Sequence, residues 1–270
     1  MARRQVLTIA GAADPQAPVP AAVAAGNMVY GMRVTGQEPG SGRLPSDPQA
    51  QIEQLFQNLE AYLRQAGGDL GDLAFAGVYM ADMVYREQLN HTWLRLFPSE
   101  SDRPARNTVQ QPLTGGQIAS AEFTAVLGGS SATARRQVLK LPGVAEVHNP
   151  APTAVRVRNY VHCVRVTGQE PGSGRFPEDP RAQIEQLFAN IDALFEQAGG
   201  SIDDLAFIKI SLRSSDGEGL QNVAHREILN EVWLRYFPDR DDRPARHTVP
   251  AAMPDNRLIS ASFSGVLGPI

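Results

Sequence analysis

The sequence predicts an α+β fold in which one domain occurs twice in tandem, each copy a β-sheet with two helices packed on one face. Two observations lead there: an internal repeat that spans the chain, and the order of helical and extended stretches within each copy. The run RVTGQEPGSGR at Arg33–Arg43 recurs at Arg165–Arg175, 132 positions later (165 minus 33). A repeat of this length indicates two structural units.

Further repeated runs locate an insertion in the second copy. AQIEQLF at Ala50–Phe56 and RRQVL at Arg3–Leu7 also recur 132 positions on, whereas DRPAR at Asp102–Arg106 recurs 140 positions on (242 minus 102). Copy 2 therefore carries eight extra residues (140 minus 132), which we place in the polar stretch Ser214–Gln221. This insertion either reshapes a cleft or is a surface loop of no consequence.

The copies themselves are predicted to be residues 1–132 and 133–270. The joint between them is Gly128–Arg136, whose sequence GGSSATARR is rich in glycine and serine. Such a composition is typical of a short linker.

Two helices are expected in each copy. In copy 1, Asp47-Pro48 supplies an N-cap followed by proline at the first helical position, and Gly67-Gly68 ends the run. Between them, apolar residues recur at helical spacing: Ile52, Leu55, Phe56, Leu59 and Leu63. The equivalent helix of copy 2 begins at Asp179-Pro180. A second helix is predicted over Tyr85–Phe97, where Pro98 closes it.

The remaining ordered stretches predict strands, separated by glycine and proline turns. In copy 1 they are Gln5–Ala10, Met28–Thr35, Leu73–Met80, Asn107–Gln110 and Gln117–Leu127. The order β-β-α-β-α-β-β fits one sheet with both helices on a single face.

Composition narrows the function classes. The formal net charge of -4 offers no basic stripe for a phosphate backbone, so we expect no nucleic-acid partner. The chain has one cysteine, Cys163, and hence no intrachain disulfide, which fits a reducing compartment. No apolar run approaches a membrane span, and the start lacks the long apolar segment of a signal peptide. We therefore expect a cytoplasmic protein with no membrane partner.

Common catalytic and cofactor motifs are missing from the sequence. The five histidines show no ligand spacing, Cys163 has no CxxC partner, and neither a GxGxxG nor a Walker loop occurs. The glycines of EPGSGR lead into a proline-containing loop and are interpreted as a turn. We expect no cofactor and no metal.

The repeated PAR motif offers one chemical group. Arg106 and Arg246 each begin a predicted strand, and alternation places Thr108 and Thr248 on the same strand face as the arginine. An arginine so placed presents its guanidinium fork to a carboxylate. The alternative interpretation is a structural ion pair with Asp102 or Asp242.

The order of motifs in each copy resembles the Rid family, also called YjgF/YER057c/UK114. In copy 1 these motifs are TGQ at Thr35–Gln37, the run Gln51–Leu59, an AGG triplet, LN-x2-W at Leu89–Trp93 and RPAR-x-T-V at Arg103–Val109. The resemblance covers nearly all of each copy. It implies a chorismate-mutase-like fold that trimerises around a barrel-like sheet core, with small molecules bound in clefts between neighbouring domains.

The resemblance also implies a chemistry. In the best-known members the PAR arginine holds the carboxylate of a 2-iminoacid or 2-aminoacrylate, and water attacks the C=N carbon to release ammonia and a 2-ketoacid. By match of motif, Arg106 and Arg246 become the carboxylate clamps. The implied substrate-binding residues are Thr35, Gly36, Asn90, Trp93 and Thr108 in copy 1, and Thr167, Gly168, Asn230, Trp233 and Thr248 in copy 2.

The last strand departs from the family pattern. Active members carry a water-positioning glutamate at the place occupied here by Ser120 and Ser260. Glu122 lies two residues further, on the same strand face as Ser120, and is a candidate substitute; its counterpart in copy 2 is Ser262. A serine hydroxyl holds water but is a poor base unless another group activates it.

Three functions follow from these observations. The first is a Rid-like hydrolase or deaminase acting on an imine, an enamine or a related small carboxylate-bearing metabolite in a specialised pathway. The second is a non-catalytic module that binds a small acid. A ribonuclease or translation inhibitor is disfavoured by the negative charge. Because three two-domain chains supply six domains, enough for two trimeric rings, we expect a homotrimer.

Overall fold

The structure is a computed structural model that describes residues 4–9, 19–128, 136–144, 150–214, 225–254 and 256–268. The chain divides into two compact units. Unit 1 is Met1–Val138 with His148–Pro152, and unit 2 is Leu139–Val147 with Thr153–Ile270. Arg136, in the run that begins the second sequence repeat, therefore belongs with unit 1.

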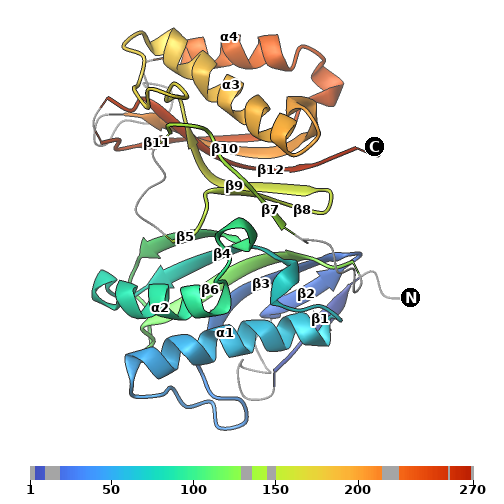
Figure 1. Cartoon of the computed structure of the whole chain (residues 1–270), viewed down its shortest axis with the longest axis vertical. Helices are drawn as coiled ribbons and strands as arrows, with labels where there is room; N and C mark the ends of the chain where they lie inside the picture. The colour runs from blue at the N-terminus through green and yellow to red at the C-terminus, as the bar shows by residue number, and fades with distance from the viewer. Residues whose placement is uncertain are drawn as a thin grey trace. The chain divides into compact units, whose positions relative to one another are not determined.

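Unit 1 is a six-stranded sheet with two helices on one face (Figure 1). The strand order is β1-β2-β3-β6-β4-β5, and only β4 and β5 run parallel. The strands are β1 Gln5–Leu7, β2 Ala22–Ala25, β3 Met28–Thr35, β4 Leu73–Met80, β5 Ala105–Gln110 and β6 Ala119–Val126. The helices are α1 Pro48–Gln65 and α2 Arg86–Leu96, with the 3-10 turns η1 Leu70–Asp72, η2 Met83–Tyr85 and η3 Glu100–Asp102.

Unit 2 repeats this topology, with strand order β11-β10-β12-β9-β8-β7 and a parallel pair β10-β11. Its strands are β7 Arg136–Leu139, β8 Ala154–Val157, β9 Tyr160–Thr167, β10 Leu205–Arg213, β11 Ala245–Ala251 and β12 Ile259–Val266. Its helices are α3 Pro180–Gln197 and α4 Arg226–Tyr236, with the 3-10 turns η4 Ile202–Asp204 and η6 Arg240–Asp242. The predicted α+β class with two helices per sheet is confirmed.

The helix boundaries follow from the predicted caps. The Asp47 carboxylate accepts a hydrogen bond from the Ala50 amide at 2.8 Å, and Asp179 does the same for Ala182. Past the end of α1, Gly67 has a φ of 86°, a left-handed conformation that favours glycine. The second predicted helix is α2.

The strands match the prediction, apart from one strand that was missed and the shifted ends of β1, β5 and β6. β3 and β4 have the predicted bounds, whereas β5 begins at Ala105, two residues before the predicted start. Strand β2 was missed, because its four residues, AVAA, contain one β-former among alanines and no polar residue to give an alternating pattern. The predicted strand Gln5–Ala10 is ordered as β1 only to Leu7, and Ala10 lies outside the described residues.

The two faces of the unit 1 sheet differ in what they contact. The face toward the helices carries core residues such as Ala76, Val78, Ala121 and Phe123, all at most 2% exposed. Since side chains alternate along a strand, the intervening residues of β4 and β6 lie on the opposite face. This division separates the candidate site residues.

Two predicted segments fall largely outside the described residues. The insertion at Ser214–Gln221 is described only at Ser214, and the linker Gly128–Arg136 only at its two ends. Within the described ranges, no helix combines the length and the apolar character that crossing a membrane requires.

Candidate carboxylate-binding site

Arg106 lies in a buried polar cluster against α2. Its Nη2 donates to Asn90 Oδ1 at 2.5 Å, and its guanidinium lies 4.7 Å over the Trp93 ring. Only 2% of Arg106 is exposed. Burial, and then the neighbouring positive charge of Arg86, lower its pKa to about 9.

Arg246 repeats the arrangement in unit 2. It donates to Asn230 Oδ1 at 2.6 Å and lies 4.8 Å over the Trp233 ring. Its Nη1 is buried, yet no described residue accepts a hydrogen bond from it, and the same holds for the Thr248 hydroxyl. Burial, followed by the charge of Arg226, lowers the pKa of Arg246. Buried polar atoms normally have partners, so these atoms are candidates for contact with a ligand or an ordered water.

Asp102, the structural partner considered for Arg106, is engaged elsewhere. Its Oδ1 lies 3.3 Å from Nε of Arg136. In unit 2, none of the described acidic side chains forms an ion pair with Arg246, Asp242 included. Sequence reasoning missed the role of Arg136, although the repeated RRQVL run was the signal that pointed to it.

A second polar cluster lies on the helix-free face of the unit 1 sheet. Thr35 of β3, Ser120 of β6 and Tyr79 of β4 are successive cross-strand neighbours. Glu122 is two residues along β6 and lies over Gly77, where a Cβ atom would come within 2.6 Å of its Oε1. Burial, then a hydrogen bond to Glu122 and its charge, raise the pKa of Tyr79 to about 12. Tyr79 was also missed by the sequence analysis.

The TGQ glycines have a packing role. A Cβ on Gly36 would approach the Gln51 carbonyl oxygen to 2.2 Å, and one on Gly168 would approach that of Gln183 to 2.1 Å. The preceding threonine hydroxyls donate to Gln37 and Gln169 at 3.1 and 3.0 Å. The TG pair therefore brings the strand end against α1 or α3.

The predicted site residues of one domain fall into two groups. Arg106 pairs with Ala76 of the core face, so it shares the helix side with Asn90 and Trp93. Ser120 and Glu122 lie on the opposite face, and Thr35 is three strands away from β5. At about 4.8 Å per strand, that is roughly 14 Å across the sheet. A single domain does not bring the two groups together.

The helix-free face of unit 2 lacks the acid. Ser260, Ser262 and Ser211 occupy the places of Ser120, Glu122 and Tyr79, and Lys209 replaces Gly77. Thr167 lines a cavity of about 50 Å³ together with Arg165 and Arg257, whereas Arg246 does not contribute to it.

Other nucleophile and metal chemistry finds no support in the described residues. Cys163 is fully buried, and this burial raises the pKa of its thiol to about 12, so it is not a nucleophile at neutral pH. No group of three or more His, Cys, Asp or Glu side chains within the described ranges is arranged so that it could hold a metal ion.

Each of the two six-stranded α+β domains has an arginine–asparagine–tryptophan cluster between its edge strand and its second helix. This arrangement defines the class as a tandem-duplicated Rid protein. The family model described as Endoribonuclease L-PSP matches residues 10–119 and 145–258. The chain belongs to this family.

Known relatives match one copy at a time. The chain is 29% identical over 111 residues to a RutC family protein of Aquifex aeolicus, covering 41% of this chain and 82% of that protein. It is 28% identical over 109 residues to the chloroplastic Reactive Intermediate Deaminase A of Arabidopsis thaliana, covering 40% of this chain and 57% of that protein. The crystal structure of RidA from an Antarctic Psychrobacter is 30% identical, with a TM-score of 0.42, and matches 46% of this chain and 99% of its own.

Proposed function

We propose that the protein is a Rid-type hydrolase acting on an imine, an enamine or a related small metabolite that bears a carboxylate. The observation that carries this proposal is the environment of the Arg246 guanidinium. It is stacked on the Trp233 ring and donates a hydrogen bond to Asn230. Its Nη1 atom is buried, and no described residue accepts a hydrogen bond from it. A carboxylate is the planar, charged acceptor that suits such a donor.

The reaction adds water to the C=N carbon, after which the nitrogen leaves as ammonia and a 2-ketoacid remains. One group must take a proton from the water, and another must return protons to the nitrogen. In copy 1, Glu122 is the carboxylate available as the base. The Tyr79 hydroxyl, whose pKa is raised to about 12, stays protonated and donates to it.

The two halves of this chemistry come, in our proposal, from different chains. Glu122 and Arg106 lie on opposite faces of one sheet, so they do not meet at one substrate within a domain. We therefore pair Arg246 of one chain with Glu122 of another. A homotrimer in the cytoplasm, as the family resemblance implies, would supply such pairs.

Imine hydrolysis tests the proposal directly. An amino-acid oxidase generates 2-iminoacids in the presence of semicarbazide, and loss of the trapped imine is followed for the wild type, Arg106→Ala, Arg246→Ala and the double variant. We expect activity that falls with Arg246→Ala. Equal rates for the wild type and the double variant on every iminoacid tried would exclude the hydrolase.

A non-catalytic binding module is the second candidate function. The serines at 260 and 262 favour it, because the helix-free face of copy 2 has no base at these positions. Under this alternative, calorimetric titration with small 2-ketoacids gives binding that needs Arg246, while no iminoacid is turned over.

A further inference from the structure

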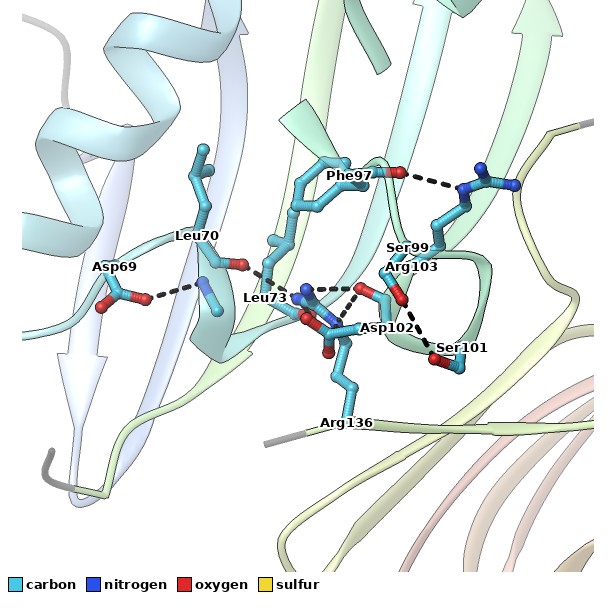
Figure 2. Close-up of polar contacts among 10 residues, drawn as sticks. Asp69, Leu70, Leu73, Phe97, Ser99, Ser101, Asp102, Arg103 and Arg136 are labelled. Carbon is cyan, nitrogen blue, oxygen red and sulfur yellow. Dashed lines mark hydrogen bonds and ion pairs between the residues drawn. The ribbon is translucent and has the colours of Figure 1, made fainter. Parts of the chain in front are cut away.

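Arg136 is held in a socket of backbone carbonyls within unit 1 (Figure 2). Its Nη1 donates to the carbonyl oxygens of Leu70 and Leu73 at 2.9 and 2.7 Å, and its Nη2 and Nε donate to that of Asp102 at 2.8 and 3.1 Å. The Phe97 ring lies 5.3 Å from the guanidinium carbon. We call this set of groups the carbonyl socket. Only 2% of the Arg136 side chain is exposed.

The repeat gives Arg136 a counterpart in Arg4. Both are the second arginine of the run RRQVL, 132 positions apart (136 minus 4). Arg4 is exposed, and no described residue forms an ion pair or a side-chain hydrogen bond with it. Next to it, Val6 is 56% exposed, which is unusual for a valine in a strand. The arginine of the repeated peptide is therefore buried and hydrogen-bonded at position 136, and exposed at position 4.

Copy 2 carries the corresponding residues of the socket, and two of them, Leu205 and Phe237, have the same backbone conformation as their counterparts in copy 1. Its carbonyls belong to Ile202, Leu205 and Asp242, and its ring to Phe237. Leu205 has φ and ψ of -66° and 120°, against -66° and 117° for Leu73. Phe237 has -126° and 71°, against -126° and 70° for Phe97. Because backbone dihedrals fix the directions of carbonyls, this second socket is built to accept an arginine.

No described side chain fills the second socket. None donates to the carbonyls of Ile202, Leu205 or Asp242, and Asp242 is exposed. Its surroundings are open as well: Ala206 and Ala245 are exposed, whereas their counterparts in copy 1 are Ala74 and Ala105, both 0% exposed. Phe207 beside them is 43% exposed. The exposed apolar side chains form a surface that an apolar strand could cover. The carbonyl oxygens and the Asp242 carboxylate beside them are acceptors for an arginine on that strand.

We propose that Arg4 of a second copy of this chain docks in the copy 2 socket, as Arg136 docks in the copy 1 socket. The partner's Arg4 would meet three carbonyl oxygens and the Asp242 carboxylate, and its Val6 would cover the apolar surface. The contact joins two different surfaces of the chain, so each copy offers both an arginine and a socket. It does not depend on the proposed hydrolase activity.

Sedimentation velocity at tens of micromolar protein tests the contact. The wild type, Arg4→Ala and Asp242→Arg are compared, each tagged at the C-terminus so that the residues around Arg4 are unaltered. Removing one partner of a buried, hydrogen-bonded charge costs enough to raise the dissociation constant about thirtyfold or more. We expect both variants to sediment as single chains at concentrations where the wild type associates.

Mixing the two variants sharpens the test. Arg4→Ala keeps an intact socket, and Asp242→Arg keeps an intact arginine, so an equal mixture regains one contact and forms a species of two chains. Arg43→Ala, which changes another exposed arginine, is the matched control and associates like the wild type. Since Arg4 is exposed, its replacement leaves the melting temperature of the dilute protein unchanged. A wild type that is a single chain at these concentrations, or an Arg4→Ala variant that associates equally well, overturns the proposal.

Discussion

The division of the candidate site between two sheet faces makes a prediction that variants of whole chains can test. Arg246→Ala removes the proposed carboxylate clamp, and Glu122→Gln removes the only glutamate of the two last strands, β6 and β12. Arg106 pairs with the helix side of its sheet, and the repeat gives Arg246 the equivalent place. If the clamp and the base that act on one substrate come from two chains, each variant supplies what the other lacks.

The size of the regained activity follows from this geometry. In an equal mixture, a site has an intact Arg246 in half of the cases and an intact neighbouring Glu122 in half, so about one quarter of the wild-type rate is expected. The assay is semicarbazide-trapped imine hydrolysis after the variants are mixed at low concentration and then concentrated together. Each variant alone should remain at the background rate.

A matched control excludes effects of mixing itself. Arg246→Ala combined with the double variant Arg246→Ala, Glu122→Gln contains no intact Arg246, so its rate stays at background. If the first mixture also stays at background although the chains exchange, Arg246 and Glu122 act from one chain, and the proposed pairing between chains is refuted.

Three further predictions concern single groups. Arg136→Ala removes the hydrogen bonds to the carbonyls of Leu70, Leu73 and Asp102, although the Leu70 carbonyl still accepts from the Leu73 N–H. It should lower the free energy of unfolding by about 3–5 kcal/mol, whereas Arg4→Ala costs under about 0.5 kcal/mol in dilute protein; denaturant titration of both variants decides. Since the folded pKa of Tyr79 is raised from 10.0 to about 12, its contribution to stability is present below pH 10 and is lost as the pH rises toward 12. Tyr79→Phe should remove that component from denaturation curves taken across this range, and curves that keep the wild-type slope contradict it. Arg246→Lys should raise KM for an iminoacid at least about tenfold, because lysine lacks the planar fork, and an unchanged KM would argue against a bidentate clamp.

Much of the fold was readable from the sequence because local signals agreed with the tertiary structure. The Asp-Pro caps and the helical spacing of apolar residues gave both long helices, and the alternation after the PAR proline gave the shared face of Arg106 and Thr108. Strand β2 escaped because four residues dominated by alanine become a strand only through pairing with β1 and β3.

The candidate site was less predictable, because its grouping depends on sheet order and not on spacing along the chain. The sequence motifs grouped Arg106, Thr35 and Glu122 into one site. In the structure, β6 and β4 lie between the strand of Thr35, β3, and the strand of Arg106, β5. Because side chains alternate along a strand, Glu122 lies on the opposite face of the sheet from Arg106. Nothing in the sequence around Tyr79 marks it as a site residue, because it lies in a largely apolar strand. It joins Glu122 only through the antiparallel register of β4 and β6.

The loss of the acid in copy 2 is coupled to a second difference. Glu122 lies over Gly77, its direct cross-strand partner, where even a Cβ atom would come within 2.6 Å of its carboxylate. In copy 2 the same two places hold Ser262 and Lys209, again directly opposite one another. The glycine–glutamate pair of copy 1 thus corresponds to a lysine–serine pair in copy 2. A lysine is tolerated where the neighbouring carboxylate is gone.

This coupling predicts how a base could be restored to copy 2. Ser262→Glu alone places the new carboxylate opposite the Lys209 ammonium, and the resulting cross-strand ion pair occupies it. Lys209→Gly together with Ser262→Glu reopens the space that Glu122 uses in copy 1, and Ser211→Tyr adds the matching hydroxyl donor. We expect the triple variant, in the Glu122→Gln background, to regain imine hydrolysis that Ser262→Glu alone does not. Equal activity of the two would show that Lys209 does not restrain the carboxylate.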